Sequence, residues 1–154
     1  MMENIRLSNN FNFFELTITE HRRYLELNRQ EGLNFMNNAH SLARNLLQPI
    51  RDYFNQPLIV HSGFRCTKLN KAIGGSPRSQ HCLFEACDFH IIGIDLASIF
   101  QWIQINSNLK WGQLILEGWS VGHPSWIHIS LCGNRPPERC QMVMTYDGKQ
   151  YIQL

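Results

Sequence analysis

The stretch Ser79–Ile92 reads SQHCLFEACDFHII and decides the fold, because it leads from a polar loop into a run rich in apolar and aromatic residues. We expect a strand over 86–92. His81 precedes this strand, and Asp88 follows seven residues later, inside it. The stretch therefore places two metal-ligating residue types at the junction of a loop and a strand.

A second stretch, SWIHIS at 125–130, carries His128 between two isoleucines. Alternate side chains of a strand share a face, so His128 points away from the side on which the isoleucines pack. Together with His81 and Asp88 it makes a set of two imidazoles and one carboxylate, which suits zinc and leaves a fourth position for water. A lone histidine is more often structural than metal-binding, so this spacing suggests a site without deciding it.

The other segments predict an α+β fold. Residues 33–54 place apolar side chains at steps of three and four, which predicts an amphipathic helix that Pro49 kinks or restarts. Thr67 is expected to cap a short helix over 67–73, which glycines end. The further expected elements are strands over 57–61, 111–117 and 125–131, a helix capped by Asp95 and ending near 106, and a hairpin over about 141–153 that turns at Asp147 and Gly148. We expect one domain, residues 1–154, with a central, mainly antiparallel sheet and helices packed on it.

Composition and charge narrow the class of protein. The chain has 154 residues and a formal net charge of +2, too small to predict nucleic-acid binding. No apolar run approaches the roughly 20 residues that span a bilayer, so no membrane insertion is expected. The first residues lack a signal-peptide pattern, and five cysteines without a CxxC pair favour a reducing compartment. We expect a chain that is cytoplasmic as synthesised.

Seven separated motifs occur in the order and approximate spacing of one enzyme family. They are SGFR (62–65), LN (69–70), IGG (73–75), SQH (79–81), ACD (86–88), QLILE (113–117) and WIHIS (126–130). In these motifs the chain resembles the zinc D-Ala-D-Ala carboxypeptidase family. The elements FNFFELT (11–17) and LQPIR (47–51) make it most similar to the short, phage-type branch, and the resemblance spans most of 11–135. It implies a hedgehog/D,D-peptidase-like fold.

The resemblance also implies a role for each matching residue. His81, Asp88 and His128 are expected to bind one Zn²⁺ per chain, and Glu117 to act as the general base on zinc-bound water. Zinc brings the pKa of bound water to about 7, so a nearby carboxylate can take the proton. Arg65 is expected to hold the substrate carbonyl or terminal carboxylate, for which a guanidinium offers planar, permanently charged donors.

Other residues of these motifs receive supporting roles. Substrate contacts or supporting hydrogen bonds are expected from Ser62, Ser79, Gln113 and Trp126. His61 and His123 are candidates for a second catalytic histidine, and His90 shares the strand face of Asp88. We interpret Cys82 and Cys87 as buried thiols rather than ligands.

Two departures from the family pattern bear on function. Phe84 stands where the family normally has glycine, three residues after the first ligand, so the loop must accommodate a large side chain. Glu117 lies eleven positions before His128, so the base must be brought back by a loop. If Phe84 blocks the site, a zinc-stabilised, non-catalytic binding module is the alternative, as in the signalling domain of hedgehog proteins.

The expected function is therefore hydrolysis of peptide bonds in the peptidoglycan stem, by a D,D-carboxypeptidase or an endopeptidase of endolysin type. The stem peptide is the expected partner, and the chain is taken as a monomer. It is expected to reach the cell wall after release or export, with a phage as a possible source. A further alternative is a phage structural or morphogenesis protein that uses the same fold.

Overall fold

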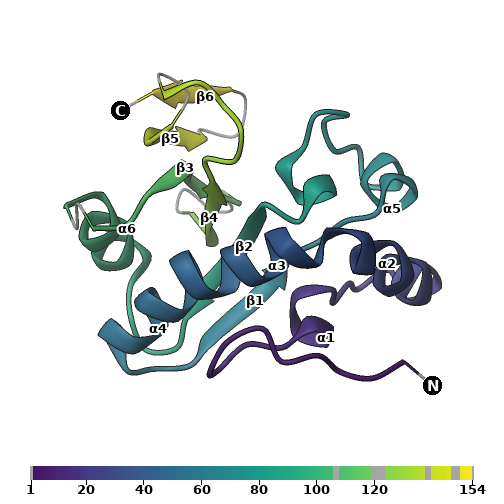
Figure 1. Ribbon diagram of the computed structural model, residues 1–154. Coiled ribbons are helices and arrows are strands. Elements are labelled where there is room, and N and C mark those ends of the chain that lie inside the picture. Colours follow the sequence, from purple (N-terminus) through teal and green to yellow (C-terminus); the bar gives the residue numbers. More distant parts are fainter. Residues whose placement is uncertain (1, 106–107, 119–123, 138–139, 147–149, 154) are drawn as a thin grey trace.

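A six-stranded sheet forms the centre of the computed structural model, which describes all residues except 1, 106–107, 119–123, 138–139, 147–149 and 154 (Figure 1). The strands are β1 (Leu58–Ser62), β2 (Ala86–Ile91), β3 (Trp111–Glu117), β4 (Trp126–Leu131), β5 (Met142–Tyr146) and β6 (Tyr151–Gln153). They are arranged in the order β1-β2-β4-β3-β5-β6. Only the β3–β5 pair among these described strands is parallel. The predicted α+β fold with a mainly antiparallel sheet is confirmed.

The position of β4 between β2 and β3 decides which side chains meet. Asp88 on β2 lies opposite His128 on β4, and Glu117 on β3 lies opposite Trp126 on β4. Residues that are far apart in sequence therefore become cross-strand neighbours on adjacent antiparallel strands. The pairing of β3 with β4 thus brings Glu117 and His128 close in space, although they are far apart along the chain.

Helices lie along the sheet and at its ends. They are α1 (Phe13–Leu16), η1 (Arg22–Tyr24), α2 (Leu25–Gly32), η2 (Leu33–Phe35), α3 (Met36–Leu42), η3 (Ala43–Leu47), α4 (Gln48–Phe54), α5 (Thr67–Ala72), η4 (Gln80–Leu83) and α6 (Leu96–Ile105). Figure 1 shows α3 and α4 crossing the β1–β2 part of the sheet, with α6 near β3. No helix in the described ranges is both long enough and apolar enough to cross a membrane.

The helix expected over 33–54 is present as four consecutive pieces. The 3₁₀ turn η2 leads into α3, the π-helical turn η3 and then α4, whose first turn contains Pro49. In a regular α-helix the ring of Pro49 would clash with the carbonyl four residues earlier. Here the wider, π-helical η3 turn comes just before Pro49. Pro49 thus restarts the helix, as predicted.

The hydrophobic core lies between the α3–α4 layer and the sheet. Its fully or almost fully buried side chains include Leu42, Leu46, Leu47 and Ile50 from the helices and Phe89, Ile91, Ile127 and Ile129 from the sheet. The two isoleucines beside His128 enter this core, which confirms the expected alternation along β4. The core therefore fixes the face on which His128 lies.

The two helix-capping predictions have different outcomes. Asp95 caps α6 as expected, since its Oδ1 accepts a hydrogen bond from the backbone N–H of Ser98 at 2.9 Å. The prediction for Thr67 is wrong, because Thr67 is the first helical residue of α5 and Cys66 occupies the capping position. The backbone N–H of Cys66 donates to Asn28 Oδ1 at 2.7 Å, so a tertiary contact with α2 fixes the start of α5.

The end of the chain adds two strands and a disulfide. β5 and β6 pair antiparallel, which confirms the C-terminal hairpin, while its expected turn at Asp147 and Gly148 lies outside the described residues. Cys132 and Cys140 form a disulfide with their Cα atoms 5.2 Å apart. Cys132 follows β4 and Cys140 precedes β5, and their pairing departs from the free thiols that a reducing compartment would favour.

Candidate metal and substrate site

Three ligand atoms from η4, β2 and β4 converge on one buried point. His81 Nε2 lies 3.2 Å from His128 Nδ1 and 3.3 Å from Asp88 Oδ1. His128 Nδ1 lies 2.8 Å from the same carboxylate oxygen. Among the described residues these three form the cluster with metal-ligand character. The structure therefore brings together the three residues predicted to bind metal.

Backbone contacts hold His81 in the orientation that a metal ligand needs. Its Nδ1 donates to the carbonyl of Gly63 at 2.6 Å, which leaves the Nε2 lone pair facing Asp88 and His128. The carbonyl of His81 accepts from the backbone N–H of Arg65 at 3.1 Å. A side chain at Gly63 would overlap the backbone of Leu16, so the close approach of these segments requires glycine there.

Burial and mutual charge set the protonation of the cluster. Burial lowers the pKa of His81, which favours the neutral, ligating imidazole. Burial by itself would raise the pKa of Asp88, but the charges and hydrogen bonds of His81 and His128 outweigh it and hold that pKa well below its usual range. The site therefore presents a carboxylate beside imidazole nitrogens, as a divalent cation requires.

The donor set fits zinc. Ligands at about 2.0–2.1 Å from a tetrahedral zinc ion lie about 3.3 Å from one another. The three spacings of 2.8–3.3 Å are close to that value before any ion draws the ligands into place. The other nitrogen of His128, Nε2, is buried without a hydrogen-bond partner among the described residues, so the imidazole is held by packing and by its Nδ1 contacts.

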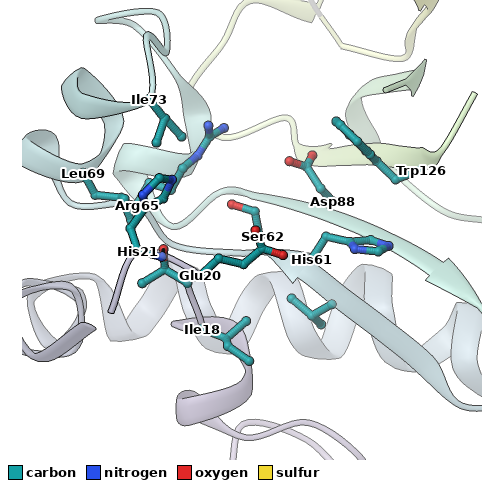
Figure 2. Close-up of a pocket in the computed structure, with 12 residues that line it drawn as sticks. Ile18, Glu20, His21, His61, Ser62, Arg65, Leu69, Ile73, Asp88 and Trp126 are labelled. Carbon is teal, nitrogen blue, oxygen red and sulfur yellow. Dashed lines mark hydrogen bonds between the residues drawn. The ribbon is translucent and has the colours of Figure 1, made fainter. Parts of the chain in front are cut away.

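A cavity of about 440 Å³ opens beside Asp88. Figure 2 shows Ser62 between Arg65 and Asp88, with Leu69 and Ile73 toward the Arg65 side, Ile18 below Ser62 and Trp126 toward the Asp88 side. The Nε of Arg65 is buried and has no hydrogen-bond partner in the described part of the chain. The cavity thus offers an unpaired guanidinium and an apolar wall next to the ligand cluster.

A register shift in β1 turns additional polar residues toward this cavity. Val60 pairs with Phe89 and Ser62 pairs with Asp88, so His61 is an extra residue between them. An extra residue of this kind re-aims side chains at the edge of a sheet. His61 lines the cavity, and its Nε2 lies 2.7 Å from Nδ1 of His90 on β2. Burial lowers the pKa of His61, which favours a neutral ring there.

Glu117 lies next to the cavity rather than in its wall. Its Oε2 accepts from the indole N–H of Trp126 at 3.4 Å, and its Oε1 accepts from the hydroxyl of Tyr151 at 2.8 Å. The indole ring packs so closely on the backbone of Gly118 that a side chain there would overlap it. Trp126, which lines the cavity, therefore contacts Glu117 through its indole N–H.

The remaining predicted residues fall at varying distances from the cavity. Ser79 directly precedes the η4 turn that carries His81, and Gln113 donates its backbone N–H to Ser130 Oγ at 2.9 Å, but neither lines the cavity. His123 lies outside the described residues. Cys87 is buried in the core on the opposite strand face from Asp88, as interpreted from strand alternation.

Phe84 occupies the left-handed region that the family's glycine would occupy freely. Its φ is 57° and its ψ is 30°, and its side chain is fully buried. The ring packs against Phe13 and Phe64, at centroid distances of 6.1 Å and 5.2 Å. Phe84 is thus a core residue that does not line the cavity, and the ligand cluster forms in its presence.

Sequence reasoning missed the contribution of the segment before α2. Glu20 and His21 line the cavity together with Ile18, yet no spacing relates them to the ligands. It also missed Gly63, because its backbone carbonyl, not a side chain, orients His81. The SGFR motif contains this glycine, so a pattern analysis that included backbone acceptors had a signal to find it.

Fold and site together define a candidate metal-binding protein, in which a mixed sheet presents a buried His-Asp-His cluster beside a cavity. The family model for peptidase M15 matches residues 10–130. The chain belongs to this family of zinc-dependent peptidases. No protein with curated annotation matches it.

Proposed function

We propose that this zinc peptidase hydrolyses peptide bonds in the stem peptide of bacterial peptidoglycan, as a D,D-carboxypeptidase or an endopeptidase. The observation that carries the proposal is the unpaired Arg65 guanidinium in the cavity beside the ligand cluster. None of the ion pairs formed in the described ranges engages Arg65. Arg65 is half-buried, and a guanidinium without a partner among the described residues is suited to an anionic ligand group.

The chain's own residues account for substrate positioning. Arg65 binds a carboxylate or the developing oxyanion of the substrate, because its planar donors match two oxygens at once. Ser62 lies between Arg65 and Asp88 and can donate to the same region (Figure 2). Ile18, Leu69 and Ile73 give an apolar surface for a small side chain such as that of alanine.

The reaction assigns a metal-holding role to three residues and a proton-transfer role to a fourth. His81, Asp88 and His128 would hold the zinc, which supplies Lewis-acid activation of water when bound. Glu117 accepts a proton from the attacking water and passes it to the leaving amine. The hydrogen bonds from Trp126 and Tyr151 hold the Glu117 carboxylate beside the cavity for this role.

A muropeptide digest tests this proposal directly. Zinc-loaded protein and its Glu117→Gln variant are incubated with purified muropeptides, and the products are identified by mass spectrometry. We expect cleavage by the parent and a loss of about 10²–10⁴-fold in the variant, with zinc content unchanged. Glu26→Gln, an exposed change on α2, is the matched control. Unaltered cleavage in Glu117→Gln refutes the assigned base.

The same digest separates the alternatives. A parent protein that retains zinc and binds muropeptides without cleaving them supports the binding-module alternative instead. Phe84 supplied the reason for that alternative, and its ring lies in the core rather than in the cavity wall. Because the substrate belongs to the cell wall, the proposal also places the site of action there, after release or export. The phage-type motifs in 11–17 and 47–51 support a phage origin.

A further inference from the structure

The C-terminal hairpin lies beyond the residues that match the family model, yet it reaches Glu117. The match ends at residue 130, while β5 and β6 begin at Met142 and Tyr151. β5 adds to the free edge of β3, with Leu116 paired to Thr145. β6 adds to β5, with Tyr151 paired to Tyr146, the residue after Thr145. The hairpin therefore places Tyr151 in the same row as Glu117, two strands away.

We propose that Tyr151 is a positioning residue for the general base Glu117. The inference rests on the proposed function, because it takes Glu117 as the base. The Tyr151 hydroxyl donates to Oε1 at 2.8 Å, and the Trp126 indole approaches Oε2 at 3.4 Å. One donor on each oxygen fixes the plane of the carboxylate. Each oxygen keeps a second lone pair for the proton that the base must accept.

The contact from Tyr151 is the shorter of the two and contributes most of this restraint. A glutamate at the end of a strand otherwise samples several rotamers about its three side-chain torsions. The Trp126 contact alone, at 3.4 Å, restricts them weakly. Without the Tyr151 hydroxyl, the carboxylate spends less time in the orientation that faces the reacting water. Turnover falls as a result, while substrate binding at Arg65 is unchanged.

Steady-state kinetics on the zinc-loaded protein test the catalytic part of the proposal. Tyr151→Phe deletes the hydroxyl and keeps the ring. We expect kcat to fall about ten-fold, less than after loss of the base itself, with KM and zinc content unchanged and the melting temperature lowered by no more than the few degrees that loss of one hydrogen bond causes. Tyr53→Phe is the matched control, since Tyr53 is 60% exposed and stacks on Trp102, away from the cavity. In a Glu117→Gln background, Tyr151→Phe should cause no further loss.

A double-mutant cycle on unfolding tests the contact without catalysis. The free energies of unfolding of metal-free parent, Tyr151→Phe, Glu117→Gln and the double variant should be non-additive. Additive changes, or a Tyr151→Phe protein with parental kcat, overturn the inference. A Tyr151→Phe protein that loses zinc, or melts earlier by more than those few degrees, overturns it in favour of a structural role. If the parent cleaves no muropeptide, the proposed function fails, and the catalytic role of Tyr151 fails with it, whereas the cycle still reports whether the contact forms.

Discussion

Phe84 affects the free energy of unfolding in two opposite ways: its strained backbone lowers it, and the packing of its side chain raises it. The substitutions Phe84→Ala and Phe84→Gly separate the two effects. The left-handed backbone of Phe84 costs a residue other than glycine about 1–2 kcal/mol. Truncation of a fully buried phenylalanine to alanine costs about 3–5 kcal/mol, from lost burial and the cavity left behind. We expect Phe84→Ala to lower the free energy of unfolding by that amount. Phe84→Gly should lower it by only about 2–4 kcal/mol, because glycine relieves the strain.

The informative result is which of the two variants, Phe84→Ala or Phe84→Gly, has the higher free energy of unfolding. Urea unfolding of the metal-free protein, followed by tryptophan fluorescence, gives both free energies by linear extrapolation. Leu42 is the control position, because it is fully buried in a helix with a φ of −58°. There glycine should be less stable than alanine by about 1 kcal/mol. A Phe84→Gly protein that is no more stable than Phe84→Ala refutes the strain argument, and a loss below about 1 kcal/mol in both refutes the packing argument.

Three further predictions concern the site. His81→Ala and His128→Ala should each lose bound zinc by metal analysis, and a full equivalent retained in both contradicts the assigned ligands. Burial lowers the pKa of His81 below its usual 6.5, so the folded metal-free chain binds fewer protons than the unfolded chain, and the free energy of unfolding should fall as pH drops below 6.5. Asp88, whose pKa is also lowered, extends that loss below pH 3.8; urea unfolding at several pH values checks the sign, and stabilisation by acid contradicts it. Arg65→Lys should reduce kcat/KM about ten-fold, mainly through KM, in muropeptide kinetics, and an unchanged KM contradicts its substrate role.

Sequence patterns predicted those features of the fold that depend only on residues close together in the chain. Alternation over 125–130 correctly assigned the two isoleucines to the core and His128 to the opposite face. The capping prediction succeeded at Asp95, where the hydrogen bond closes within three residues. It failed at Thr67, where the start of α5 depends on Asn28, 38 positions away from Cys66. Local rules carry no information about such a distant partner.

In the site, too, the sequence predicted what depends on the chemistry of single residues and missed what depends on contacts between distant residues. Chemistry at three positions, His81, Asp88 and His128, indicated a divalent metal before any distance was known. The orientation of His81 depends on the carbonyl of Gly63, which no side-chain pattern reports. The surroundings of Glu117 likewise depend on Tyr151, which β5 and β6 bring across the sheet from 34 residues away.

The sequence by itself determined the ligand types, the strand faces and the helix restart at Pro49, because residue chemistry and backbone sterics act over a few positions. Only the tertiary structure decided the order β1-β2-β4-β3-β5-β6, and that order places β4 beside both β2 and β3. It also decided that the N-terminal segment lines the cavity and that the C-terminal hairpin contacts Glu117. These arrangements arise from burial of apolar surface shared by distant segments, a free energy that no single stretch of sequence contains.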